Sequence, residues 1–202
     1  MNAFTQKFIT SLWEGDPQIS TVERRLKKEC EQLSAIEAGV IGRDLILRKQ
    51  ALYTKIFNLA AFLATEGGLG SDGFMDFADC TAILPEERYS SLLANPDLLI
   101  DDSISSNFSE IYAVREICNV FDRGLFDGAD GEHFLDYLVL GDDDGYDWDE
   151  IQSWTAEDAR THLPRLYKKS GHLFAPCSTD TVTERHPDAV GFNDLIPGLG
   201  DS

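Results

Sequence analysis

The sequence predicts a mainly α protein: a single compact helical domain of about seven to nine helices, followed by a Pro/Gly-rich C-terminal tail. Apolar residues recur at helical spacing along most of the chain, and capping residues or Gly/Pro breaks separate these stretches. No segment alternates apolar and polar residues over the length of a strand. The 202 residues suit one domain, predicted to span residues 1–172, with residues 173–202 as a flexible tail or surface strap.

Residues 2–13 form the first predicted helix, because four apolar side chains share one face of it: Phe4, Phe8, Ile9 and Leu12. The sequence Gly15-Asp16-Pro17 ends this helix. Ser20 or Thr21 is the predicted N-cap of the second helix. The polar face of that helix carries a basic cluster from Arg24 to Lys28. A solvated helix face is the main interpretation of this cluster, and a phosphate-binding patch is the alternative.

The most apolar stretch of the chain, residues 52–63, is predicted to lie in the central helix. Its side chains are apolar nearly all round the helix, which is typical of a buried helix. A capping box from Ser34 to Glu37 begins this helix, which is predicted to span residues 35–64. An interruption near Gly39 or Gly42 is the alternative to one continuous helix.

A glycine-rich break follows at residues 67–70, and glycine supplies the left-handed conformation that often ends a helix. Ser71 or Asp72 is the predicted N-cap of the next helix. A phosphate-binding loop is the alternative for this stretch, but the Lys-Ser/Thr pair of a Walker motif is missing. Pro85 suits the first turn of a further helix, which is predicted to end at Asn95-Pro96-Asp97.

The second half of the chain carries three further structural signals. Residues 108–121 have the apolar spacing of a helix, and a glycine-containing loop is predicted to begin near Gly124. Residues 141–150 are predicted to be an acidic loop that leads into a helix. Pro164 is predicted to break a helix or to begin one.

The acidic loop at residues 141–150 is a candidate calcium site. A standard calcium loop needs Asp at position 1 and Glu at position 12, and aligning Gly145 at position 6 places apolar residues at both. The main interpretation is therefore a loop in which Asp147 or Asp149 caps a helix and Trp148 packs inward. The histidines and cysteines lack the spacing of metal ligands or nucleophiles, so no metal, cofactor or catalytic residue is assigned.

Charge is distributed unevenly along the chain, which has 17 basic and 36 acidic residues and a net charge of −19. Residues 61–159, named here the acidic block, hold 3 basic and 24 acidic residues, a net charge of −21. Residues 1–60 have a net charge of +2, and residues 160–202 have none. Such a block repels nucleic acid and anionic membranes and attracts basic partners. An acidity that serves only solubility is the alternative.

The cysteines and the N-terminus predict a cytoplasmic location. Four cysteines are spaced as free thiols, which suits a reducing compartment: Cys30, Cys80, Cys118 and Cys177. The first residues lack the apolar core of a signal peptide, and no apolar run approaches the roughly 20 residues of a transmembrane helix.

Several short landmarks follow one another in order across residues 4–172. They are Ala60-Ala61, Gly67-Gly68, Ser71-Asp72-Gly73-Phe74, Phe77, Tyr89, Asn95-Pro96-Asp97-Leu98, Gly145-Tyr146-Asp147-Trp148-Asp149 and Leu163-Pro164-Arg165-Leu166. In this order they resemble the bacterial family named domain of unknown function 4240. The resemblance implies a soluble, mostly helical bacterial domain and transfers no activity. Leu69 stands where the family typically has Cys, and residues 79–82 replace its Trp-Leu pair.

These observations together favour a non-catalytic binding protein that engages a basic protein partner, as an immunity or inhibitor protein does. The candidate binding residues are Asp72, Asp76, Asp142, Asp143, Asp144, Asp147, Trp148 and Asp149. One alternative is a DNA mimic whose carboxylates imitate phosphates. Another is an enzyme with its pocket near residues 67–74 and Trp148. No direct nucleic-acid binding and no membrane binding are expected, and the sequence leaves the oligomeric state open.

Overall fold

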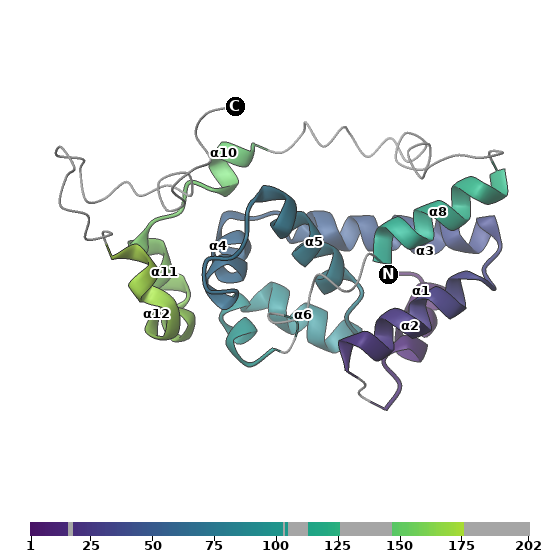
Figure 1. The fold of residues 1–202 in the computed structure, drawn as a ribbon, viewed down its shortest axis with the longest axis horizontal. Coiled ribbons are helices and arrows are strands. Elements are labelled where there is room, and N and C mark those ends of the chain that lie inside the picture. Colours follow the sequence, from purple (N-terminus) through teal and green to yellow (C-terminus); the bar gives the residue numbers. More distant parts are fainter. Residues whose placement is uncertain (16–17, 103, 105–112, 126–146, 176–202) are drawn as a thin grey trace.

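The structure, a computed structural model, describes residues 1–15, 18–102, 104, 113–125 and 147–175 (Figure 1). It is 77% helical and contains no strand in this described part, where nine helices have at least seven residues. The predicted mainly α fold is thereby confirmed. In the same part of the chain, no helix is both long enough and apolar enough to cross a bilayer.

Four helices pack together at one end of the molecule: α1 (Ala3–Leu12), α2 (Ile19–Cys30), α3 (Ala35–Ala51) and α8 (Ala113–Leu125) (Figure 1). Helix α8 lies along α3 and also contacts α2. The helix predicted for residues 108–121 is present in its described part and ends at Leu125, one residue past Gly124; the rest of the predicted loop lies outside the described residues.

The start of α2 differs from the prediction. Gln18, which makes no side-chain capping bond, is the N-cap, and Ser20 and Thr21 lie inside the helix. Ile19 and Val22 are buried on the inner face of this first turn. Burying a large aliphatic side chain stabilises by about 1.5–3 kcal/mol, whereas a capping side chain contributes about 1 kcal/mol. Packing therefore outweighs the better cap.

The single helix predicted for residues 35–64 was wrong, because it is divided into α3 and α4 (Lys55–Ala64). The predicted capping box is present, with Ser34 and Glu37 bonded to each other's backbone. The break falls at residues 52–54 rather than at either glycine of α3. It lets both Leu52 and its neighbour Tyr53 enter the core, and Thr54 caps the new helix.

Helix α4 is the central helix, as predicted. Its residues from Phe57 to Ala64 are all buried. It contacts five elements: α5 (Ser71–Ala82), the 3-10 helix η1 (Pro96–Asp101), α10 (Trp148–Ile151), α11 (Ala156–His162) and α12 (Pro164–Ser170). A helix surrounded in this way buries apolar side chains on every face.

The turn after α4 uses two left-handed residues, Glu66 with φ 57° and Gly67 with φ 84°. The Gly67 amide donates to the Phe62 carbonyl oxygen at 2.9 Å, which closes the helix end. The predicted caps of α5 were wrong, because Gly70 is its N-cap and no side chain caps it. Asp72 lies in the first turn, where a carboxylate is stabilised by the helix dipole instead.

A buried carboxylate joins two elements that are far apart in sequence. Asp97 of η1 is only 4% exposed and accepts the backbone amides of Arg165 at 3.0 Å and Leu166 at 2.8 Å. Helix α12 begins at Pro164, as predicted, and its own N-cap residue Leu163 supplies no side-chain acceptor. Asp97 therefore caps α12 from outside the helix.

The C-terminal elements pack against α4. Trp154 is 1% exposed, and its indole nitrogen donates to the Asn58 side-chain oxygen at 2.8 Å. The chain continues into the 3-10 helix η4 (Gly171–Phe174), whose Leu173 and Phe174 pack on the core. The boundary predicted at residue 172 thus falls inside η4.

Candidate functional site

The structure describes five of the eight predicted binding residues and brings their two segments together. Trp148 of α10 is half-buried, and its ring centroid lies 5.4 Å from that of Tyr53 and 6.3 Å from that of Phe74 on α5. Trp148 thus connects α10 to Phe74 of α5, while α10 itself packs against α4. Asp142, Asp143 and Asp144 lie outside the described residues.

The two segments also carry carboxylates. The group named here the α5–α10 surface consists of Asp72, Asp76, Asp147, Trp148, Asp149 and Glu150. Asp72, Asp149 and Glu150 are exposed, whereas the side chain of Asp147 accepts the Glu150 amide at 3.0 Å and caps α10. This cap confirms one of the two predicted alternatives.

Asp76 is the least exposed carboxylate of the α5–α10 surface. Burial raises the pKa of Asp76, and the negative charge of Asp72 one turn away adds to this rise, while Lys49 opposes it. The ionised form of Asp76 is therefore less favourable in the folded protein than in water.

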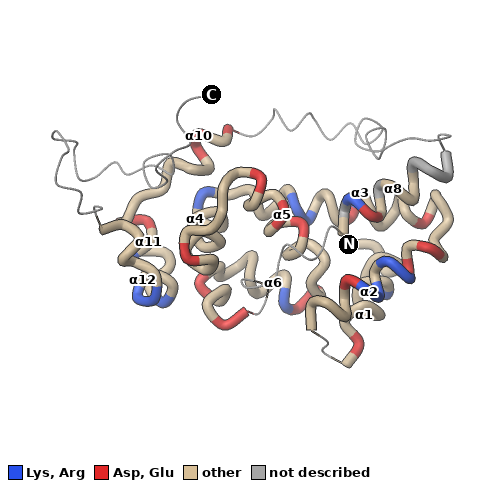
Figure 2. The backbone as a smooth tube through the Cα atoms, in the orientation of Figure 1, with Lys and Arg blue, Asp and Glu red and all other residues tan. Residues whose placement is uncertain are grey.

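Much of the acidic block is neutralised within the fold. Seven of its carboxylates form ion pairs: Glu66–Lys169, Asp79–Lys49, Glu86–Arg48, Asp101–Arg165, Asp102–Arg88, Glu157–Arg160 and Asp158–Lys55. Six of the seven basic partners come from outside the block. Figure 2 shows that basic and acidic positions are interspersed along the helices rather than separated into two faces. The acidic block is therefore not one continuous unpaired face.

Another set of acidic side chains has no ion pair with any described residue. Apart from Asp97 and Asp147, which accept backbone amides, this set within the acidic block comprises Asp72, Asp76, Glu87, Glu116, Asp149 and Glu150. Four of the six belong to the α5–α10 surface, and one of these four, Asp76, interacts electrostatically with Lys49 and Arg115 without forming an ion pair.

A shallow groove lies between α6 (Glu86–Ala94) and η1, and sequence reasoning missed it. Its volume is about 380 Å³, and it is lined by Pro85, Glu87, Arg88, Ser91, Leu92, Leu98, Asp101 and Asp102. Three lining residues carry carboxylates and one carries a guanidinium. The one signal in the sequence that could have indicated this groove is the pair of acids Asp101-Asp102, directly after an apolar run. We call this cavity the α6–η1 groove.

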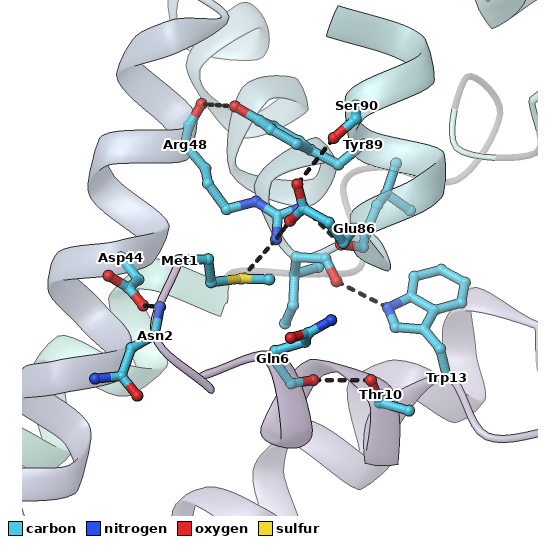
Figure 3. A network of polar contacts seen from close by, with 12 residues as sticks. Met1, Asn2, Gln6, Thr10, Trp13, Asp44, Arg48, Glu86, Tyr89 and Ser90 are labelled. Carbon is cyan, nitrogen blue, oxygen red and sulfur yellow. Dashed lines mark hydrogen bonds and ion pairs between the residues drawn. The ribbon is translucent and has the colours of Figure 1, made fainter. Parts of the chain in front are cut away.

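Arg48 is a buried cation whose contacts are structural (Figure 3). Its guanidinium donates to the Leu84 carbonyl oxygen at 2.7 Å and lies 3.9 Å from the centre of the Tyr89 ring. The Tyr89 hydroxyl donates to the Arg48 carbonyl oxygen at 2.9 Å, and Glu86 lies 3.5 Å from the guanidinium. These bonds join α3 to the start of α6, so Arg48 is committed to the fold rather than presented to an anion.

The enzyme alternative placed a pocket near residues 67–74 and Trp148. Phe74 is fully buried and Trp148 packs on it, so aromatic rings fill the region where a pocket was predicted. Among the described residues, no three His, Cys, Asp or Glu side chains come together as metal ligands. Cys30 and Cys80 are buried, and the two described histidines are exposed at separate helix ends.

No match was found when the chain was compared with models of protein families, with curated proteins and with solved structures. The resemblance to domain of unknown function 4240 therefore stays a prediction. The structure gives two of its landmarks a physical connection, because Asp97 of one landmark caps the helix that begins at Pro164 of another.

Proposed function

We propose that this protein is a non-catalytic binding protein that engages a basic protein partner, in the manner of an immunity or inhibitor protein. The observation that carries the proposal is the α5–α10 surface, which combines four carboxylates without an ion pair among the described residues with the half-buried Trp148. The proposed setting is the bacterial cytoplasm, which the spacing of the cysteines in the sequence and the family resemblance favour.

Charge and an aromatic anchor serve different purposes in such an interface. Uncompensated carboxylates attract a basic surface over a distance and increase the association rate. This attraction is screened over about 8 Å at physiological salt. A half-buried tryptophan supplies apolar contact area, and tryptophan is enriched among the residues that dominate binding energy. Trp148, held by Tyr53 and Phe74, is such an anchor and needs little reordering on binding.

Affinity capture from the native host, at low and at high salt, tests the proposal. We expect a basic protein to be retained at low salt and released at high salt. The double substitution Asp72→Lys/Asp149→Lys should weaken its binding by about tenfold or more and flatten the salt dependence. The matched control is Glu14→Lys/Glu31→Lys, which changes the net charge equally at exposed sites outside the acidic block.

Fluorescence provides a second measurement on the same complex. Trp13 and Trp154 are buried, so a change in tryptophan emission on binding reports chiefly on Trp148, and Trp148→Phe should abolish it. Equal affinity of both charge-reversal variants would refute the proposal. Competition by duplex DNA for the captured partner would instead favour the DNA-mimic alternative.

A further inference from the structure

The α6–η1 groove combines an apolar floor with an acidic rim. Leu92 is 3% exposed and Leu98 is partly buried against the core, and both line the groove. Glu87 stands exposed on the α6 side, and Asp101 stands exposed on the η1 side. An apolar floor beside carboxylates is suited to a long basic side chain, whose methylene stem lies on apolar surface while its charge reaches the acids.

The groove already has a guanidinium at its rim. Arg165 of α12 donates to the Asp101 carboxylate at 2.5 Å, and both side chains are well exposed, at 47% and 66%. The backbone of Arg165 is held separately, through the bond from its amide to Asp97. The Arg165 side chain is therefore free to leave Asp101 without disturbing the start of α12.

We infer that the α6–η1 groove binds an arginine side chain of a basic partner, and that Arg165 occupies Asp101 as an intramolecular competitor until the partner arrives. This inference rests on the proposed function, since it names one side chain of the partner and the groove that receives it. Exchange of one exposed guanidinium for another at Asp101 keeps the same type of ion pair.

The second arginine of the groove has a different role. Arg88 pairs with Asp102 through two nitrogens and lies 5.1 Å from the centre of the Trp13 ring. Asp102 also accepts the Ile104 amide at 2.9 Å, which fixes the carboxylate. Arg88 and Asp102 therefore form a wall of the groove, and Glu87 and Asp101 are the acids that receive the ligand.

Arginine is favoured over lysine by the shape of the acceptor. A planar guanidinium binds a carboxylate through two parallel hydrogen bonds, whereas an ammonium group interacts as a point charge. The groove volume of about 380 Å³ accommodates one such side chain but no folded element. The partner is thus expected to present an arginine on an exposed loop or segment.

The test uses a small probe, so that it does not depend on finding the partner. The isotope-labelled full chain is titrated with N-acetyl-arginine amide and, separately, with N-acetyl-lysine amide, and backbone amides are followed by NMR. We expect saturable shifts at Ser91, Leu98 and Asp101, and tighter binding of the arginine probe.

Two substitutions separate local competition from net charge. Arg165→Gln should tighten binding of the arginine probe by about two- to fivefold, the range expected for releasing an exposed ion pair. Arg160→Gln removes the same charge from an exposed pair on α11, outside the groove, and should change the affinity less. Glu87→Gln should weaken binding, because it removes a receiving acid that has no ion pair in the described part.

Shifts that do not saturate at the groove would overturn the inference, as would equal affinities of the Arg165→Gln and Arg160→Gln variants. Either result leaves the proposed function standing if salt-dependent capture of a basic protein is still observed. Saturable binding at the groove with empty captures at both salts would overturn the assignment of a protein partner.

Discussion

Replacing Asp97 by alanine should release the start of α12. The carboxylate is 4% exposed, and its two oxygens each accept one backbone amide of this helix, at 3.0 and 2.8 Å. Pro164 occupies the first helical position and has no backbone N–H that needs a partner. Arg165 and Leu166 follow at the second and third positions, whose amides a capping side chain ordinarily bonds. No other side-chain acceptor is placed to replace it within the described part of the helix start.

The expected loss of stability follows from the two backbone amides that Asp97→Ala leaves without an acceptor. A buried donor without a partner costs about 1–3 kcal/mol, and a lost N-cap costs about 0.5–2 kcal/mol. Arg165 is exposed, so water can reach one of the two amides, whereas Leu166 is fully buried. We therefore expect Asp97→Ala to lower the free energy of unfolding by about 2–3 kcal/mol, or the melting temperature by roughly 5–10 °C.

Denaturant unfolding and amide hydrogen exchange measure this effect. The amides of Arg165 and Leu166 should exchange faster in Asp97→Ala, while amides of α2 should change only as global stability does. Asp101→Ala is the control, because it removes an exposed acid four residues away and should cost less than about 1 kcal/mol. Equal destabilisation by both variants, or unchanged exchange at the two amides, would refute the external cap.

Three further predictions concern other parts of the fold. Burial raises the pKa of Asp76, so the folded protein favours the protonated carboxyl group. The stability that this carboxyl group contributes is present below about pH 4 and is lost as the pH rises through the folded-state pKa. Asp76→Asn should therefore stabilise the protein at neutral pH and barely affect it at about pH 3. Trp154→Phe should cost about 2–3 kcal/mol, since it leaves the buried Asn58 oxygen without its donor. Gly67→Ala should cost about 1 kcal/mol through the left-handed backbone alone, because an added Cβ would meet only ordinary contacts at 3.5 Å or more.

Each of these predictions has its own control. For Asp76→Asn, thermal unfolding across pH is compared with Asp72→Asn, and a loss of stability at neutral pH would contradict the assigned sign. Trp154→Phe is combined with Asn58→Ala in a double-mutant cycle, and strictly additive costs would argue against the hydrogen bond. Gly15→Ala is the control for Gly67→Ala. Gly15 also has a positive φ, of 78°, and a Cβ added there would lie in open space, so this variant reports the cost of the left-handed backbone alone.

Local signals in the sequence predicted much of the helical layout. The capping box at Ser34, the buried stretch of α4 and the helix start at Pro164 depend on residues within one or two turns, and all three are confirmed. The errors arose where packing between residues far apart in the sequence determines where a helix begins or ends. The break at residues 52–54 exists because Leu52 and Tyr53 both reach the core, which no local periodicity shows.

The candidate site was less predictable than the fold. Trp148 and Phe74 are far apart in the sequence, and only the structure shows their rings in contact. The α6–η1 groove depends on how one helix and the following 3-10 turn diverge, which propensities do not determine. The ion pairs could not be predicted either, because a count of charged residues does not show which acidic side chain pairs with which basic one.

The ion pairs give the uneven charge of the sequence a physical explanation. A net charge of −19 opposes compaction through self-repulsion, and the acidic block alone carries −21. The fold places Lys49 and Lys55 from one flank and Lys169 from the other against carboxylates of the block. Each of these ion pairs reduces the repulsion between neighbouring carboxylates. Carboxylates that are grouped without ion pairs keep this repulsion in the folded protein. On the α5–α10 surface, burial raises the pKa of Asp76 and the charge of Asp72 adds to this rise, while Lys49 and Arg115 lower it. The basic partner proposed above would favour the ionised form of Asp76 further by placing positive charge beside it.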